Sequence, residues 1–171
     1  MIHYASLPFG AVTLTDLFAT EGSTEEAAKQ IEEFFTEQLK KLDWLAEVDA
    51  ETQMIGVGGS FRNLYKMVKL VKKYPMDNAH NYHFEKEDFS SIYNMLKALD
   101  VDKRKKIKGL SASRADIMPA AMAIINAFTE YMQKGEFLLS SNGLREGIMF
   151  NQALPMTLEK PVTDVLPAMF V

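Results

Sequence analysis

The spacing of apolar residues predicts helices alternating with a strand in the first half of the chain. Ser23 and Glu26 match a capping box, in which a hydroxyl and a carboxylate satisfy free amides at a helix start. Behind it, the apolar residues that share one helical face are Ile31, Phe35, Leu39 and Leu42. Residues 52–57 predict a short buried strand that stops at a glycine pair. A helix over 61–73 follows, with an expected core of Leu64, Val68 and Val71. This order is typical of an α/β fold.

The remaining segments are assigned from shorter signals. His3–Leu7 indicates a short strand, and the apolar spacing of 9–18 fits a helix, although its threonines leave that assignment open. Tyr74-Pro75 ends a helix because the residue before proline disfavours helical dihedrals. The predicted elements after it are a helix over 87–99, a buried helix over 113–134, a strand over 137–140 and a helix over 144–151. We expect one unit over 1–154 and a loosely ordered, proline-containing tail over 155–171.

Composition narrows the class of protein without identifying it. A chain of 171 residues, 47% hydrophobic and 25% charged, is ordinary for one globular domain. It has no cysteine, no apolar run long enough to span a bilayer and no signal-peptide pattern, so we expect a cytoplasmic protein without a membrane partner. The net charge of -4 repels polyanions. We therefore expect no DNA partner, and a phosphate-rich ligand would need cations gathered at one place.

The first candidate site is the glycine turn between the strand at 52–57 and the helix after it. Glycines allow a ligand to approach the backbone closely, and a helix N-terminus offers free amides with a dipole that favours anions. Gly58, Gly59 and Ser60 are therefore candidate phosphate-binding residues. The spacing matches neither the P-loop nor the dinucleotide fingerprint, so an ordinary tight turn remains the alternative.

The second candidate is Arg114, at the start of the most apolar predicted helix. Its guanidinium can hold a phosphate with two parallel hydrogen bonds. Alternatively, Arg114 and Asp116 cap the helix or pair with each other, and a cap is worth about 0.5–2 kcal/mol. No Ser/His/Asp or Cys/His set and no close carboxylate pair indicates acid–base or nucleophilic catalysis. We therefore predict no catalytic residue in this chain.

Two other groups of residues have ordinary explanations. The basic run 103–108 can attract a polyphosphate together with Lys66, Lys69, Lys72 and Lys73, but such charges are usually a solvated helix face. His80 and His83 lie near Asp77 in the sequence. An extended segment turns side chains three residues apart to opposite sides, so we predict no metal site there.

Five short motifs follow one another along the chain. They are 6–15 (SLPFGAVTLT), 56–64 (GVGGSFRNL), Tyr74-Pro75 followed by His80 and Tyr82, 110–117 (LSASRADI) and 140–147 (SSNGLREG). In this order they resemble the exopolyphosphatase / guanosine pentaphosphate phosphohydrolase (Ppx/GppA) family. Each motif is modest alone, but the set extends from Ser6 to about Phe150. The motif residues expected to brace the fold, or to border the substrate, are Arg62, Asn63, His80, Tyr82, Asp116, Arg145 and Glu146.

The resemblance implies an incomplete ribonuclease-H-like lobe of the actin-like ATPase superfamily, the second of two lobes. Family members remove the terminal phosphate of polyphosphate or guanosine pentaphosphate with an activated water and magnesium. Their general base, phosphate loops and metal ligands precede the first motif, and only five residues precede Ser6 here. The resemblance thus implies a fragment of a phosphoanhydride hydrolase that is inactive alone and needs the first lobe or a homodimer partner. The alternative is a non-catalytic module that binds phosphate-rich ligands or a partner chain.

The resemblance also implies a strand order. The segments 3–7, 52–57 and 137–140 correspond to the third, fourth and fifth strands of the lobe, and the last two pair in parallel. The first strand, which is absent here, would lie between the third and the fourth. We therefore expect 3–7 to lack a strand neighbour, and 52–57 to expose an apolar edge that invites another chain, formed by Met54, Ile55 and Val57.

Overall fold

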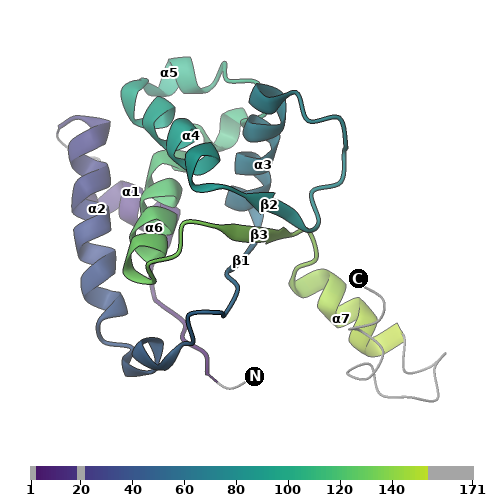
Figure 1. Ribbon diagram of the computed structural model, residues 1–171. Helices are drawn as coiled ribbons and strands as arrows, with labels where there is room; N and C mark the ends of the chain where they lie inside the picture. Colours follow the sequence, from purple (N-terminus) through teal and green to yellow (C-terminus); the bar gives the residue numbers. More distant parts are fainter. Residues whose placement is uncertain (1–2, 19–21, 154–171) are drawn as a thin grey trace.

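A computed structural model describes residues 3–18 and 22–153, which fold into helices around one small sheet (Figure 1). The α-helices are α1 (Ala11–Phe18), α2 (Thr24–Leu39), α3 (Gly59–Lys72), α4 (Lys86–Ala98), α5 (Val101–Arg104), α6 (Met118–Tyr131) and α7 (Leu144–Ala153). Two 3-10 helices are η1 (Asp43–Glu47) and η2 (Ala112–Arg114). The strands are β1 (Ile55–Val57), β2 (Tyr82–Phe84) and β3 (Phe137–Ser140).

The sheet has the order β1-β3-β2, with β1 parallel and β2 antiparallel to the central strand β3. Ile55 lies opposite Leu138, and Val57 lies opposite Ser140. The predicted pairing of the strands at 52–57 and 137–140 is therefore confirmed. Strand β1 is shorter than predicted, although Met54 already accepts a hydrogen bond from the Leu138 N–H at 2.9 Å.

Strand β2 was not predicted from the sequence. Its three residues alternate between buried and exposed, with Tyr82 and Phe84 inside and His83 outside. The rings of Phe84 and Phe137 stack with centroids 4.8 Å apart, which fixes β2 beside β3. A period of two cannot be read reliably from three residues that follow a polar stretch.

The N-terminal segment His3–Leu7 is not a strand, so that prediction is wrong. As expected, it has no strand neighbour, and without one it makes no ladder hydrogen bonds. Instead, Leu7 packs on the apolar cluster formed by α2, η1 and α6, and the His3 ring stacks on Trp44 with centroids 5.3 Å apart. In the next segment, 9–18, the chain is helical from Ala11.

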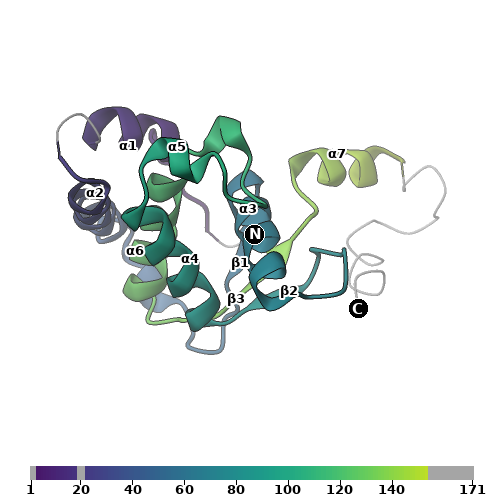
Figure 2. The ribbon, with the colours of Figure 1, turned by 90° about the horizontal axis from the view of Figure 1, so that it is seen from above.

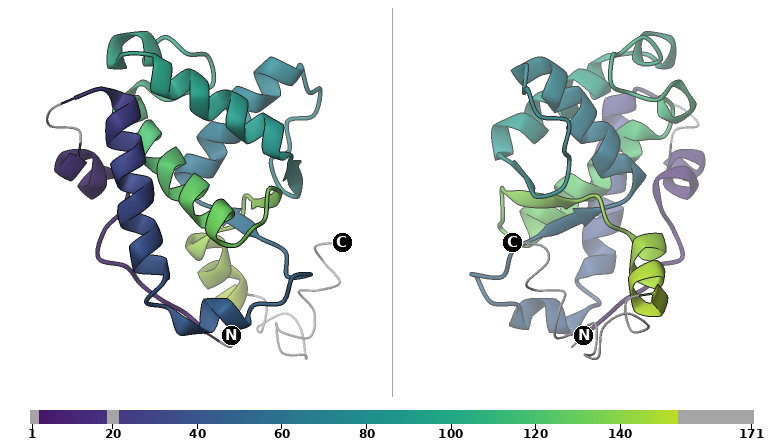
Figure 3. Two further views of the ribbon diagram at one scale, coloured as in Figure 1. Left: turned by 60° about the vertical axis from the view of Figure 1, so that its left-hand side comes forward. Right: turned by 90° about the vertical axis from the view of Figure 1, so that its right-hand side faces the viewer.

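The core lies where α6 packs against α1, α2, α3 and α4. The predicted capping box is present: Ser23 Oγ accepts from the Glu26 N–H, and Glu26 accepts from the Ser23 N–H. The predicted helix over 113–134 is shorter than expected, because α6 begins only at Met118, with Pro119 in its first turn. Figures 1 and 2 show α7 apart from the other helices, at the right of the view, and Figure 3 shows α2 beside α6.

The last turn of α3 differs from the prediction. Val71 was expected in the core but is 65% exposed, because the whole last turn of α3 after Lys69 faces solvent.

Lys134, which follows α6, donates hydrogen bonds to the carbonyl oxygens of Ala50 and Thr52, the latter at 2.6 Å. One ammonium therefore holds the irregular segment before β1. Within residues 3–18 and 22–153, no helix combines the length and the hydropathy needed to cross a membrane.

Candidate functional site

The glycine turn lies at the carboxyl end of β1, where the chain enters α3. Gly58 has φ +112°, a left-handed conformation that favours glycine. The N-terminus of α3 has no side-chain cap, and the first amides of a helix have no partners within the helix. Such amides can donate to an anion, and the phosphate-binding role of Gly58, Gly59 and Ser60 stays a prediction.

Arg114 reaches the same place from a segment more than fifty residues later. A Cβ built on Gly59 would lie 2.7 Å from Arg114 Nη2 and 2.9 Å from its Cζ. The guanidinium therefore packs directly on the Gly59 backbone, in space that only a glycine leaves open. Arg114 is half-buried. The two candidate phosphate-binding groups, predicted separately, form one cluster.

Asn63 holds this cluster together. Its Nδ2 donates to the Gly59 carbonyl at 2.8 Å, and its Oδ1 accepts from the Ser111 N–H at 2.9 Å. The side chain is buried, so both bonds are shielded from water. Asn63, which the sequence offered either as a brace or as a substrate neighbour, joins the first turn of α3 to the segment that carries Arg114.

The motif at 140–147 lies beside the glycine turn because β3 runs parallel to β1. A Cβ on Gly143 would lie 3.8 Å from Val57. Glu146 accepts a hydrogen bond from the Gly143 N–H at 2.7 Å, and this bond lowers the pKa of the Glu146 carboxyl. Glu146 therefore caps α7. Arg62 and Arg145 are exposed, and their positive charges lower the same pKa to a smaller extent.

Several residues of the basic run and of α3 already have partners within the fold. Arg104 is buried and donates to the Leu96 carbonyl at 2.9 Å and to Thr24 Oγ1 at 2.5 Å. Its neighbours Lys103 and Lys105 pair with Asp100 and Asp102. On α3, Lys69 pairs with Asp77, and Lys72 pairs with Glu85 and Asp88. These pairs favour the ordinary interpretation of the lysines.

Three other motif residues make contacts of their own. Tyr82 is buried among aromatic rings, with its centroid 5.0 Å from that of Tyr65, and burial raises its pKa. The His80 N–H donates to Asn78 Oδ1 at 3.0 Å in the turn before β2. Asp116 accepts from the Ile117 N–H and is exposed. Because α6 has no side-chain cap, the suggested capping role of Asp116 and Arg114 is wrong.

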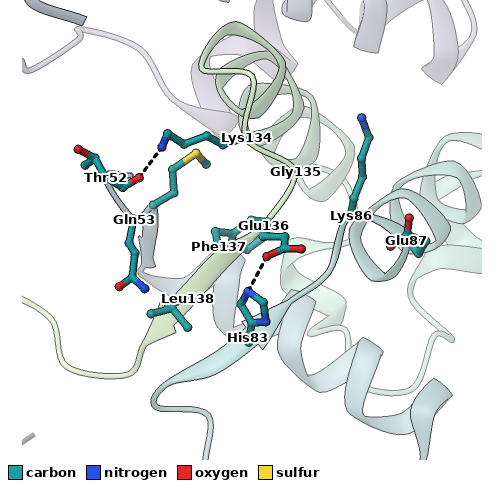
Figure 4. A pocket seen from close by; sticks show the side chains of 11 residues that line it. Thr52, Gln53, His83, Lys86, Glu87, Lys134, Gly135, Glu136, Phe137 and Leu138 are labelled. Carbon is teal, nitrogen blue, oxygen red and sulfur yellow. Dashed lines mark hydrogen bonds and ion pairs between the residues drawn. The ribbon is translucent and has the colours of Figure 1, made fainter. Parts of the chain in front are cut away.

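A separate pocket of about 480 Å³ opens at the other end of β1 and β3 (Figure 4). There His83 Nε2 lies 3.1 Å from Glu136, and Lys134 points toward Thr52. No candidate phosphate-binding residue lines this pocket. In the part of the chain that the structure describes, no group of three or more His, Cys, Asp or Glu side chains can hold a metal ion.

The fold is that of an incomplete ribonuclease-H-like lobe of the actin-like ATPase superfamily. The chain belongs to the Ppx/GppA phosphatase family, whose sequence profile matches residues 1–155. It is similar to the Ppx/GppA family member of Aquifex aeolicus, with 25% identity, a TM-score of 0.74 and coverage of 90% of this chain and 49% of that one.

An exopolyphosphatase from Cytophaga hutchinsonii has the same fold, with 23% identity, a TM-score of 0.78 and coverage of 88% of this chain and 49% of that one. The chain therefore spans about half the length of the solved relatives it matches. No curated protein matches the sequence.

Proposed function

We propose that this chain is the phosphate-holding half of a phosphoanhydride hydrolase that acts on inorganic polyphosphate or guanosine pentaphosphate. The observation that carries the proposal is the guanidinium of Arg114 packed on Gly59, at the uncapped N-terminus of α3. Membership of a phosphatase family supports hydrolysis as the reaction, and the Cytophaga relative is an exopolyphosphatase.

The cluster suits a phosphoryl group chemically. The amides of the first turn of α3 are directional donors, and Arg114 adds a planar fork that two phosphate oxygens can share. Phosphoryl transfer spreads negative charge over the equatorial oxygens, and fixed donors stabilise that charge without reorganising. Asn63 keeps Arg114 and the α3 amides in one place, so the donors are held before the ligand arrives.

We further propose that the chain does not hydrolyse its substrate alone. Members of the family are expected to use magnesium, which neutralises charge on the phosphates. Among residues 3–18 and 22–153, no three acidic or imidazole side chains gather into a group that could hold a metal ion. The resemblance implies that the metal ligands and the water-activating base lie in the other half of the family fold.

Two measurements with the purified chain test the proposal. Calorimetric titration with tripolyphosphate should show binding that depends on Arg114. Phosphate release from polyphosphate or guanosine pentaphosphate, with magnesium, should stay at background until the N-terminal half of the Aquifex relative is added. Phosphate release by the chain alone, abolished by substituting one of its own residues, would contradict it. If tripolyphosphate binds but the added half restores no activity, the chain is a non-catalytic phosphate-binding module instead.

A further inference from the structure

Gly109 packs against the backbone of α3, in the middle of the helix. A Cβ on Gly109 would lie 2.8 Å from both the carbonyl carbon and the carbonyl oxygen of Lys66, and 2.9 Å from the Met67 nitrogen. All three atoms belong to the helix backbone, which cannot move aside as the end of a flexible side chain can. Gly109 also has φ +90°, in the left-handed region that favours glycine. Two independent constraints therefore require a glycine at this position.

From this contact the segment 109–114 runs along α3 toward the phosphate-binding cluster. Near its middle, the Ser111 N–H donates to Asn63 Oδ1 at 2.9 Å. At its end, the Arg114 guanidinium packs on Gly59. The three contacts follow α3 from its middle back to its first residue, about 10 Å along the helix axis. The segment therefore lies antiparallel to α3 and is attached to it at both ends.

The segment itself has little freedom to adjust. Leu110 is 7% exposed and belongs to the main core cluster, and its N–H donates to the Ile107 carbonyl at 3.2 Å. At the other end, the Arg114 N–H donates to the Ser111 carbonyl at 2.9 Å. Because the segment consists of two short hydrogen-bonded turns, we expect a displacement at Gly109 to be passed along it to Arg114.

We propose that Gly109 is a positioning residue of the phosphate-binding site. By seating the segment 109–114 closely on α3, it holds the Arg114 guanidinium where Arg114 and the first amides of α3 can share one ligand. Gly109 acts through Arg114, because it has no side chain and packs on α3 about two helical turns from Gly59. Its importance for phosphate binding rests on the proposed function, whereas its effect on the position of Arg114 does not.

Gly109→Ala in the full chain tests the proposal. The added Cβ must push the segment away from α3, and calorimetric titration with tripolyphosphate should show an affinity about 10-fold lower, because a small misplacement of a binding group is costly. Gly22→Ala is the matched control. Gly22 also has a positive φ, +125°, but a Cβ there would meet only the Glu26 side chain. Gly22→Ala should lose stability as Gly109→Ala does and keep its affinity.

A double variant separates positioning from support of the fold. Gly109→Ala combined with Arg114→Lys should bind tripolyphosphate no more weakly than Arg114→Lys alone, because both changes disturb the same contact. Losses of affinity that simply add would make Gly109 a structural residue and would overturn the proposal.

The position of Arg114 can also be followed without phosphate. In the chain labelled with ¹⁵N, the Gly59 amide signal should move in Gly109→Ala in the same direction as in Arg114→Lys, and it should stay in place in Gly22→Ala. An unmoved Gly59 signal in folded Gly109→Ala would show that the proposal is wrong. If the original chain does not bind tripolyphosphate, the proposed function fails, and the Gly59 signal still decides whether Gly109 positions Arg114.

Ser111→Pro tests the same segment if Gly109→Ala does not fold. Ser111 has φ −67°, the value that a proline ring imposes, so this change removes the N–H that donates to Asn63 without straining the residue itself. The Gly59 amide signal should move and the affinity for tripolyphosphate should fall. A Gly59 signal that stays in place in Ser111→Pro would show that the attachment of the segment to α3 does not set the position of Arg114.

Discussion

The Arg114 guanidinium occupies the space in which a side chain on Gly59 would stand, 2.7 Å from the position of its Cβ. Gly59→Ala therefore must displace Arg114. The contact is with the end of a flexible side chain, and alanine favours a helix more than glycine does, so stability should not fall. We expect Gly59→Ala to weaken tripolyphosphate binding while thermal unfolding stays the same or improves. Gly147→Ala in α7, where a Cβ meets nothing within 4 Å, is the control and should leave binding unchanged.

A second prediction concerns the fork of Arg114. Arg114→Lys keeps the charge but replaces a planar pair of donors with a point charge. The expected loss is about 1.5–3 kcal/mol of binding free energy, typical of a hydrogen bond to a charged group, and titration calorimetry would measure it. Lys29→Arg, at an exposed site on α2, should bind as the original chain does. A changed melting temperature with unchanged affinity would make Arg114 a structural residue only.

A third prediction concerns the link through Asn63. Asn63→Ala removes both hydrogen bonds and leaves the Ser111 N–H without this partner, which should cost about 1–3 kcal/mol in urea unfolding. Affinity for tripolyphosphate should fall too, because Arg114 is no longer held beside α3. Asn94→Ala, at an exposed site on α4, should change neither property. Full affinity in a destabilised Asn63→Ala chain would show that the link supports the fold and not the site.

Arg104 should contribute to stability and not to ligand binding. Its guanidinium is 4% exposed and donates to acceptors on three different segments. Burial lowers its pKa, so the charge is held at some cost. Arg104→Lys replaces the guanidinium by a single ammonium, which cannot reach all of these acceptors. We expect the free energy of unfolding, measured with denaturant, to fall by about 1.5–3 kcal/mol and the affinity for tripolyphosphate to stay normal. Lys106→Met, in the same basic run but exposed, should leave stability nearly unchanged.

The N-terminus of α7 should respond to acid through Glu146. The Gly143 N–H lowers the pKa of this carboxyl in the folded chain. Because the pKa of the carboxyl is lower in the folded state, ionised Glu146 stabilises that state at pH values above its pKa in the unfolded chain. This stabilisation is lost as the pH falls through its pKa in the folded chain. Backbone chemical shifts of α7 should therefore report fraying at a pH below the ordinary range of glutamate. Glu146→Gln should fray equally at all pH values, and an acid response that survives in Glu146→Gln would exclude this carboxyl as its origin.

Local signals in the sequence predicted some elements and missed others. The Ser23–Glu26 capping box is present as expected, whereas 3–7 is not a strand and α6 begins later than predicted. The parallel pairing of β1 with β3, which the resemblance implied, is also present. The sequence also singled out Gly59 and Arg114 separately, but their contact depends on Asn63, a long-range link that no local pattern contains.

Other features could not be predicted because tertiary packing decides them. In the sequence Arg104 is one cation of a basic run. In the fold it is buried, where it donates to two backbone carbonyl groups and the Thr24 hydroxyl, while Lys103 and Lys105 remain at the surface. An apolar groove beside β1 is lined by side chains from η1, α3 and α6, so the residues that form it lie far apart in the sequence. Trp44 in a short segment between α2 and β1 was the one available signal, since a tryptophan there needs an apolar neighbour.

The bonds from Lys134 to the segment before β1 also bear on the order of folding. The ammonium meets the carbonyl of Thr52 across 82 positions of the sequence, and the ring so closed contains β1, α3, β2, α4, α5 and α6. Closing so long a ring costs more chain entropy than forming the local turns within it. The helices inside can begin to form before the ring closes, whereas the Lys134 bonds require both ends to be in place. We therefore expect the Lys134 bonds to form late in folding, so that replacing Lys134 would speed unfolding more than it slows folding.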